Sequence, residues 1–258
     1  MERIQNNASS GIPGNALHTW GMLFAALGIV GKSILQNRLL MVGQVSPQTL
    51  LLAMQESGST MFIATLALVL QALETCAVPI FAFLLVEGYR HTSGFQKYIL
   101  RVLGAAVVSE VPYNLAMSGR LLDFSTRNPV FGLVLGLILL YLYDRFGEKG
   151  AKNMLLKALI TVAALVWPMM LNIAYGSCTV LIVAVLWAFR GKPNFRSVAG
   201  ASASMLCCLY SMFFLASPMG FLAVHFYNGE KGAENRAVNY LAYPLILLAA
   251  GIAGLLLA

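Results

Sequence analysis

Charged side chains are scarce in this chain of 258 residues. Asp, Glu, Lys and Arg make up 10% of it, whereas 59% is hydrophobic. A soluble domain carries roughly 25% charged residues, because its surface has to face water. With a mean hydropathy of +0.77, the composition excludes a soluble globular domain and predicts a polytopic membrane protein.

Metal-binding and nucleotide-binding motifs are also missing. The sequence has no strand-glycine-helix phosphate motif and no Gly-x-Ser-x-Gly nucleophile motif. Its four cysteines all lie inside apolar segments, without the spacing of metal ligands: Cys76, Cys178, Cys207 and Cys208. We interpret them as packing residues, and expect no metal and no disulfide framework. The net charge of +7 does not indicate nucleic-acid binding, because the basic residues stand in short clusters between apolar runs.

Long apolar runs are what the sequence does contain. A membrane-spanning helix needs about 20 apolar residues. We expect about eight spans, or nine or ten if the two overlong segments (60–89 and 198–226) are broken: 17–35, 60–89, 98–117, 130–143, 155–173, 178–189, 198–226 and 238–258. Pro79 predicts a kink near 77–79, and Ser217-Pro218 interrupts the segment 198–226. The predicted fold is an all-α membrane helix bundle, a single integral membrane domain over 1–258.

Two polar segments interrupt this pattern. Residues 1–16 form a polar tail that lacks the apolar core of a signal peptide, so we expect the first span to act as an uncleaved insertion signal. Residues 36–59 are of mixed polarity, and we expect them to lie outside the membrane or at its interface. Within them, 47–55 predicts a short interfacial helix.

Lysine and arginine in the short loops predict the orientation in the membrane. With eight spans and the N-terminus inside, ten basic residues fall in inside loops: Arg90, Lys97, Arg101, Arg145, Lys149, Lys152, Lys157, Arg190, Lys192 and Arg196. Five fall in outside loops: Arg38, Arg120, Arg127, Lys231 and Arg236. We therefore expect both termini in the cytoplasm, with His91 at the cytoplasmic end of its span.

One polar cluster follows an apolar span directly, in the stretch AVPIFAFLLVEGYRHTSGFQK over 77–97. Glu87 and His91 are four residues apart, so a helix places them on one face. A carboxylate beside an imidazole orients the ring and raises its basicity, as a general base requires. Arg90 can keep that carboxylate ionised or meet a phosphate. The alternative is a helix end whose polar groups simply meet water.

Carboxylates also occur inside the spans. Glu110 and Asn114 are four residues apart, and Glu110 stands about 12 residues, or roughly 18 Å, into its span. An ionised carboxylate is costly there, so it needs a cation, a donor or a proton. Lys32 and Arg101 are the nearest kinds of partner that the sequence offers. Glu74 is placed similarly, and a structural buried ion pair is the alternative for both carboxylates.

The remaining polar candidates stand near the ends of spans. Asn228-Gly229 indicates a tight turn after Tyr227. We interpret His225, just before that turn, and His18, at the start of the first span, as interfacial histidines.

Three runs carry a resemblance to a known family: FAFLLVEGYRHT, SEVPYN and YNGEKG. They resemble the TraX family of bacterial membrane proteins, and the similarity covers most of 74–248. The segment 36–59 is similar to that of clostridial-type members. The family is named for N-terminal acetylation of a conjugative pilin subunit and groups with the transmembrane acyltransferases. The resemblance therefore implies an acyltransferase-like bundle in the bacterial cytoplasmic membrane, in contact with lipid. It also implies transfer of an acetyl group from cytosolic acetyl-CoA to an amine or hydroxyl acceptor at or across the membrane.

Spacing and resemblance together give three groups of candidate residues. The catalytic pair is His91 with Glu87. The substrate and acceptor path is lined by Glu110, Asn114, Glu74, Asn128, Tyr227 and Asn228. The cations that suit the phosphates of acetyl-CoA are Arg90, Lys97, Arg101 and Lys231.

The chain departs from the family in the first span. Many members carry an Asp-His pair there, where this sequence has Gly31-Lys32, so His91 takes the role of base in our hypothesis. Two alternatives stay open: a permease with Glu74 and Glu110 as ion or proton sites, and a non-catalytic TraX-like membrane protein. The sequence does not specify the acceptor, the choice between direct transfer and an acetyl-enzyme, or the oligomeric state, and it allows a homo-oligomer.

Overall fold

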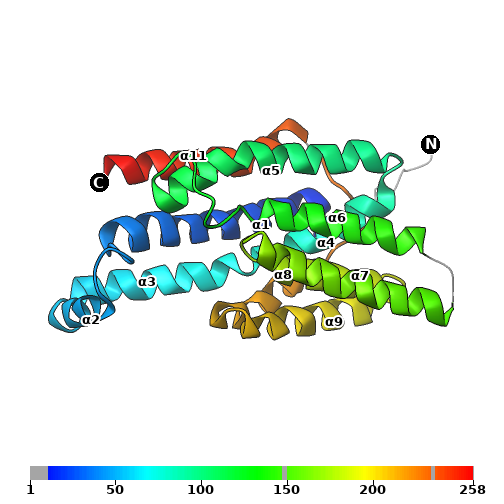
Figure 1. Ribbon diagram of the computed structural model, residues 1–258, viewed down its shortest axis with the longest axis horizontal. Coiled ribbons are helices and arrows are strands. Elements are labelled where there is room, and N and C mark those ends of the chain that lie inside the picture. The colour runs from blue at the N-terminus through cyan, green and yellow to red at the C-terminus, as the bar shows by residue number, and fades with distance from the viewer. Residues whose placement is uncertain (1–10, 147–149, 234–235, 258) are drawn as a thin grey trace, which may run out of the picture.

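A computed structural model describes residues 11–146, 150–233 and 236–257, and the predicted polar tail lies largely outside these residues, as does Lys149. In the described part of the chain the named elements are all helices, and most of them run along one common direction (Figure 1). Within the described residues, five helical segments are long and apolar enough to cross a membrane: Gly14–Leu39, Gly58–His91, Phe95–Ser118, Ala151–Met170 and Asn239–Leu256. Three apolar helices are shorter: Gly176–Ala188, Phe195–Leu209 and Met212–His225. The predicted all-α membrane bundle is confirmed.

The first span is one continuous helix of two kinds. The α-helix α1 (Gly14–Ile29) passes directly into the π-helix η1 (Val30–Leu39). The expected short helix follows as α2 (Pro47–Glu56), where the Ser46 hydroxyl accepts a hydrogen bond from the Thr49 N–H at 3.1 Å. A serine cap followed by proline at the first helical position is a strong start signal.

The overlong segment 60–89 is broken into two helices. Helix α3 (Gly58–Glu74) ends and α4 (Ala77–His91) begins around Thr75 and Cys76, just before the expected kink. Pro79 stands in the first turn of α4, where its missing N–H breaks no helical hydrogen bond. The Thr75 hydroxyl lies 2.7 Å from the Ala72 carbonyl and 3.1 Å from the Phe213 carbonyl, so the break is supported by a distant segment.

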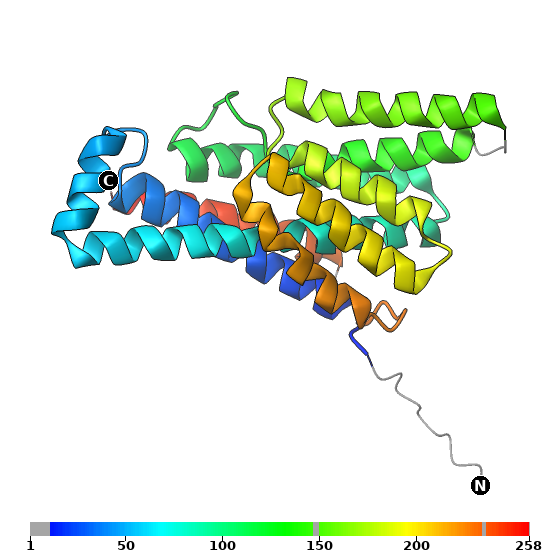
Figure 2. The ribbon, with the colours of Figure 1, turned by 90° about the horizontal axis from the view of Figure 1, so that it is seen from below.

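Helices α4 and α8 form the centre of the bundle. Helices α1, α6 (Val130–Arg145) and α8 (Gly176–Ala188) pack around α4, and helix α5 (Phe95–Ser118) packs on α6. Side chains such as Phe83, Val86 and Ile182 are fully buried there. Helix α7 (Ala151–Met170) lies at the edge of the bundle (Figure 2) and exposes apolar side chains, as a lipid-facing helix should.

The second overlong segment is also divided. Helix α9 (Pro193–Leu206) is followed by three short 3-10 helices, η2 (Cys207–Leu209), η3 (Met212–Leu215) and η4 (Ser217–Met219), and then by α10 (Gly220–His225). Ser217-Pro218 falls in η4, as the sequence predicts. The last helix, α11 (Arg236–Leu256), runs along α5 (Figure 1).

The start of α1 is tied to the segment before α11. The Ile12 N–H donates to the Phe226 carbonyl at 2.8 Å, and the Asn228 N–H donates to the Ile12 carbonyl at 3.1 Å. The Gly14 N–H then donates to the Glu230 carbonyl at 2.8 Å. These bonds fix Tyr227 and Lys231 beside the first helix.

Candidate active site

A cavity of about 1380 Å³ lies between helices α1, α4, α5 and α11. Along α1, α4 and α5 the lining includes series of residues three or four apart, which share one helical face. From α4 these are Ala77, Phe81, Leu84, Gly88 and His91, and from α5 they are Tyr98, Arg101, Ala105 and Ser109. Helix α1 adds Gly14, His18, Met22 and Ala25, and α11 adds Asn239, Tyr240 and Tyr243.

The cavity has a rim and a deep end. At the rim, the Tyr98 side chain of α5 reaches over Gly88 of α4, where a Cβ would stand 2.6 Å from the Tyr98 hydroxyl. At the deep end the lining includes Glu74 and Tyr175. Glu74 precedes Gly88 by 14 residues (74 to 88), which is about 21 Å if the path is helical throughout. The cavity therefore follows most of the length of α4.

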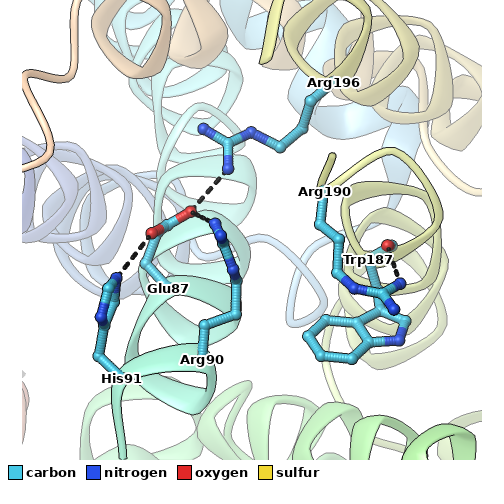
Figure 3. Close-up of polar contacts among 6 residues, drawn as sticks. All are labelled: Glu87, Arg90, His91, Trp187, Arg190 and Arg196. Atoms are coloured by element: carbon cyan, nitrogen blue, oxygen red, sulfur yellow. Dashed lines mark hydrogen bonds and ion pairs between the residues drawn. The ribbon is translucent and has the colours of Figure 1, made fainter. Parts of the chain in front are cut away.

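The Glu87 carboxylate is the centre of a charged cluster near the rim. Its Oε1 lies 2.6 Å from Arg196 Nη1 and 3.1 Å from Arg90 Nη1, while its Oε2 lies 3.5 Å from His91 Nε2. Figure 3 shows the carboxylate between these three side chains. The expected Glu87–His91 proximity is present, but it is the longest of the three contacts.

Burial differs sharply within this cluster. The side chains of Glu87 and Arg196 are 10% and 12% exposed, whereas that of His91 is 72% exposed. The Arg196 guanidinium also stacks over the Phe83 ring, 4.8 Å from its centroid. Arg196 and Glu87 thus join α9 to α4, and His91 stands at the solvent side of that junction.

The cations expected to meet phosphates fall into two places. Lys97, Arg101 and Lys231 line the large cavity. Arg90 lines a separate hollow of about 460 Å³ together with Arg190. Arg190 stacks on Trp187, with 4.1 Å from its Cζ to the ring, and donates to the Trp187 carbonyl at 2.9 Å (Figure 3).

Glu110 and its neighbours hold the loop between α5 and α6. Glu110 Oε2 accepts from the Asn128 backbone N–H at 3.2 Å and from Asn128 Nδ2 at 2.6 Å, and Arg127 Nη1 lies 3.5 Å from Glu110 Oε1. Asn128 Oδ1 accepts from the Val130 N–H at 3.0 Å and so caps α6. The cation beside Glu110 is therefore Arg127, and not Lys32 or Arg101 as the sequence indicated.

Four residues expected on the acceptor path are absent from the described cavity lining: Glu110, Asn114, Asn128 and Asn228. The Asn114 amide, oriented to suit its partners, meets the backbone of Asp123 at 3.1 and 3.2 Å. Asn228 Oδ1 accepts from the Glu230 N–H at 2.9 Å within its own turn. Glu74 and Tyr227, the other two, do line the cavity.

Glu74 is positioned by three elements. The Tyr175 hydroxyl donates to Glu74 Oε2 at 3.3 Å, and Lys32 of η1 is close enough to interact with the carboxylate electrostatically. Gly28 makes room for this side chain, because a Cβ there would collide with Glu74. Lys32, one of the two cations considered for Glu110, thus belongs to Glu74.

Comparison of the sequence with known proteins shows the family of this chain. Residues 62–253 match the family described as TraX protein. This chain belongs to the TraX family. It is 27% identical over 191 residues to a Dichelobacter nodosus protein described as "Probable fimbrial assembly protein FimC, serogroup H1", with 65% of this chain and 75% of the relative covered. No solved structure matches the chain.

The TraX match begins within α3, so the α1 wall of the cavity lies outside it. That wall contains His18, which we interpreted as interfacial and which the structure places in the cavity lining. Helical spacing groups His18 with Gly14 and Ala25 on one face of α1, but it does not indicate that this face meets a cavity. Arg196 was also missed, because a contact across 109 residues leaves no local pattern.

Proposed function

We propose that this TraX-family chain is a membrane-embedded acetyltransferase, which moves an acetyl group from acetyl-CoA to an amine or hydroxyl acceptor. The observation that carries the proposal is a large cavity with cations at its rim and imidazoles along its walls. A peptide or pilin amino terminus and an envelope glycan are the acceptor classes considered. The name of the Dichelobacter relative, a fimbrial assembly protein, supports the first.

The rim suits the donor electrostatically. Acetyl-CoA carries several anionic phosphates, and three cations line the cavity: Lys97, Arg101 and Lys231. Arginine in particular binds phosphate with paired donors. If the donor comes from the cytosol, this rim faces the cytoplasm, which agrees with the orientation expected from the basic loops.

The size of the cavity suits two reactants. Pockets for a single drug-sized ligand measure roughly 300–1,000 Å³, and this one exceeds that range at about 1380 Å³. The acyl end of the donor and the reacting end of an acceptor can therefore lie in it together. Glu74 and Tyr227 would line the acceptor's part, while Glu110, Asn114, Asn128 and Asn228 keep its walls in place.

An imidazole supplies the base for the transfer. His91, the base that the sequence indicates, lines the cavity beside Glu87. In this scheme the acceptor's N–H or O–H group attacks the thioester carbonyl carbon as the base takes its proton. The carbon–sulfur bond then breaks, and the CoA thiolate takes the proton to leave as a thiol.

The alternative of a permease has less structural support. A carboxylate that carries a proton or ion across the membrane has to exchange its partners. In the described residues, Glu110 is held by Arg127 and by both donors of Asn128. That arrangement fixes a loop and needs no transport role.

The proposal is tested by donor binding and turnover in detergent. Acetyl-CoA and CoA should raise the melting temperature where unrelated nucleotides do not, because a ligand present at 100 times its Kd stabilises the folded state by about 2.7 kcal/mol. Free CoA thiol should appear when a peptide amine or a glycan is supplied.

Rim variants refine this test. Replacing Lys97 and Arg101 together by Gln should raise the KM for acetyl-CoA, because phosphate contacts are lost. Lys152→Gln, on the exposed face of α7, is the matched control. The proposed function is overturned if CoA does not stabilise the wild-type protein and no free CoA is released from acetyl-CoA.

A further inference from the structure

Two of the chain's three histidines line the same cavity at different depths. His91 stands at the rim, and His18 packs edge-to-face on Phe81, with ring centroids 5.6 Å apart. Phe81 precedes His91 by ten residues of α4 (81 to 91), which is about 15 Å along the helix. His225, the third histidine, contacts Phe226 and is exposed.

The shape of acetyl-CoA gives the two histidines, which lie at different depths, different roles. Acetyl-CoA carries its phosphates and its thioester at opposite ends of the long pantetheine arm. Lys97 and Arg101 flank Tyr98, which meets Gly88 at the rim. When the phosphates bind there and the arm extends into the cavity, the thioester lies well below the rim. His91 is then beside the phosphates, and His18 is nearer to the reacting carbon.

A second observation concerns a residue about one helical turn deeper than Phe81. Ser109 lines the cavity, is 0% exposed, and its hydroxyl has no hydrogen-bond partner in the described part of the chain. It follows Tyr98 by 11 residues (98 to 109), or about 16 Å of helix, so it stands about one turn below Phe81. A buried hydroxyl without a partner is unfavourable, and a bound ligand oxygen would supply that partner.

We propose that the acetyl group is held between His18 and Ser109, and that His18 is the catalytic base in place of His91. This inference rests on the proposed function. Ser109 donates to the thioester carbonyl oxygen, which gains negative charge as the acceptor attacks. His18 takes the acceptor's proton and returns it to the departing CoA thiolate. His91, on the exposed side of Glu87, contributes to binding of the donor's phosphates.

Labelling with bromoacetyl-CoA tests the geometry without requiring an acceptor. Its reactive carbon stands where the acetyl group would, and an imidazole nitrogen that displaces bromide forms a stable carbon–nitrogen bond. Peptide mass mapping should find the label on His18, and an excess of acetyl-CoA should prevent the labelling. A label on His91, on a cysteine or on no residue, in protein that CoA still stabilises, would overturn the assignment. Absence of any CoA binding would instead defeat the proposed function.

Kinetics of three matched histidine variants give a second readout. His18→Gln should lower kcat for CoA release by roughly 10²–10⁴-fold, the usual contribution of general-base catalysis, with little change in KM. His91→Gln should raise KM and leave kcat nearly unchanged, and His225→Gln should resemble the wild type. Added imidazole should partly restore turnover in His18→Ala. The reverse assignment of kcat and KM effects would return the base to His91, and thermal stabilisation by CoA shows that each variant is folded.

Discussion

The junction between Glu87 and Arg196 gives the sharpest prediction for stability. Both side chains are nearly buried, and their ion pair is the shortest of the three contacts of Glu87 at 2.6 Å. Arg196→Met should therefore lower the free energy of unfolding, because it removes a charge-assisted hydrogen bond from a carboxylate with little access to water. The apolar stem of Met keeps much of the packing on Phe83.

Two known costs bracket the loss of unfolding free energy that we expect for Arg196→Met. Loss of a hydrogen bond to a charged group costs about 1.5–3 kcal/mol, whereas leaving a buried charge unpaired costs about 3–5 kcal/mol. Glu87 keeps Arg90 at 3.1 Å and His91 at 3.5 Å, so the lower range applies. We expect a loss of about 2–3 kcal/mol, or roughly 4–12 °C in Tm for a protein of this size.

A double-mutant cycle isolates the pair. Thermal unfolding in detergent of Glu87→Gln, Arg196→Met and the double variant should give a coupling energy of about 2 kcal/mol, within the range of residues in one network. Arg190→Met is the control, because its exposed guanidinium stacks on Trp187 and should contribute about 0.5–1 kcal/mol. The reasoning is refuted if the destabilisations by Glu87→Gln and Arg196→Met add within about 0.5 kcal/mol in the double variant. It is also refuted if Arg196→Met and Arg190→Met lower the Tm equally.

Three further predictions concern the walls and the rim of the cavity. Glu110→Gln should fold nearly as well as the wild type, whereas Glu110→Leu should lose about 1–3 kcal/mol for each Asn128 donor left unpaired; equal melting temperatures would contradict this. Gly28→Ala should cost about 1–3 kcal/mol by overpacking against Glu74, while Gly104→Ala, which meets open space on α5, should be neutral or stabilising. The KM for acetyl-CoA should rise between low and physiological salt, because exposed rim cations are screened, and a KM independent of salt would exclude their role.

Much of the fold could be predicted because hydropathy and proline act locally. A run of apolar residues specifies a span whatever surrounds it, and Ser217-Pro218 marks an interruption because proline lacks a donor. The break at Thr75 and Cys76 directly precedes the kink expected near 77–79, and there the Thr75 hydroxyl also contacts the Phe213 carbonyl. That contact joins segments 138 residues apart, and no local rule contains it.

The candidate site was predictable only in part, for the same reason. The Glu87–His91 proximity follows from a four-residue spacing and is present. The partners Arg196 for Glu87 and Arg127 for Glu110 depend on how helices and loops pack. Which face of α1 meets the cavity is also a tertiary property, so His18 could not be distinguished from an interfacial histidine by its position at the start of a span.

The last helix completes the cavity, and this has a consequence for biosynthesis. Tyr240 and Tyr243 of α11 form part of the cavity lining. The segment that leads to α11 forms backbone hydrogen bonds with Ile12 and Gly14. A ribosome delivers α1 long before α11. The growing polypeptide therefore has an unfinished, open-sided groove until α11 is inserted, and any capacity to capture a ligand arises only after that step.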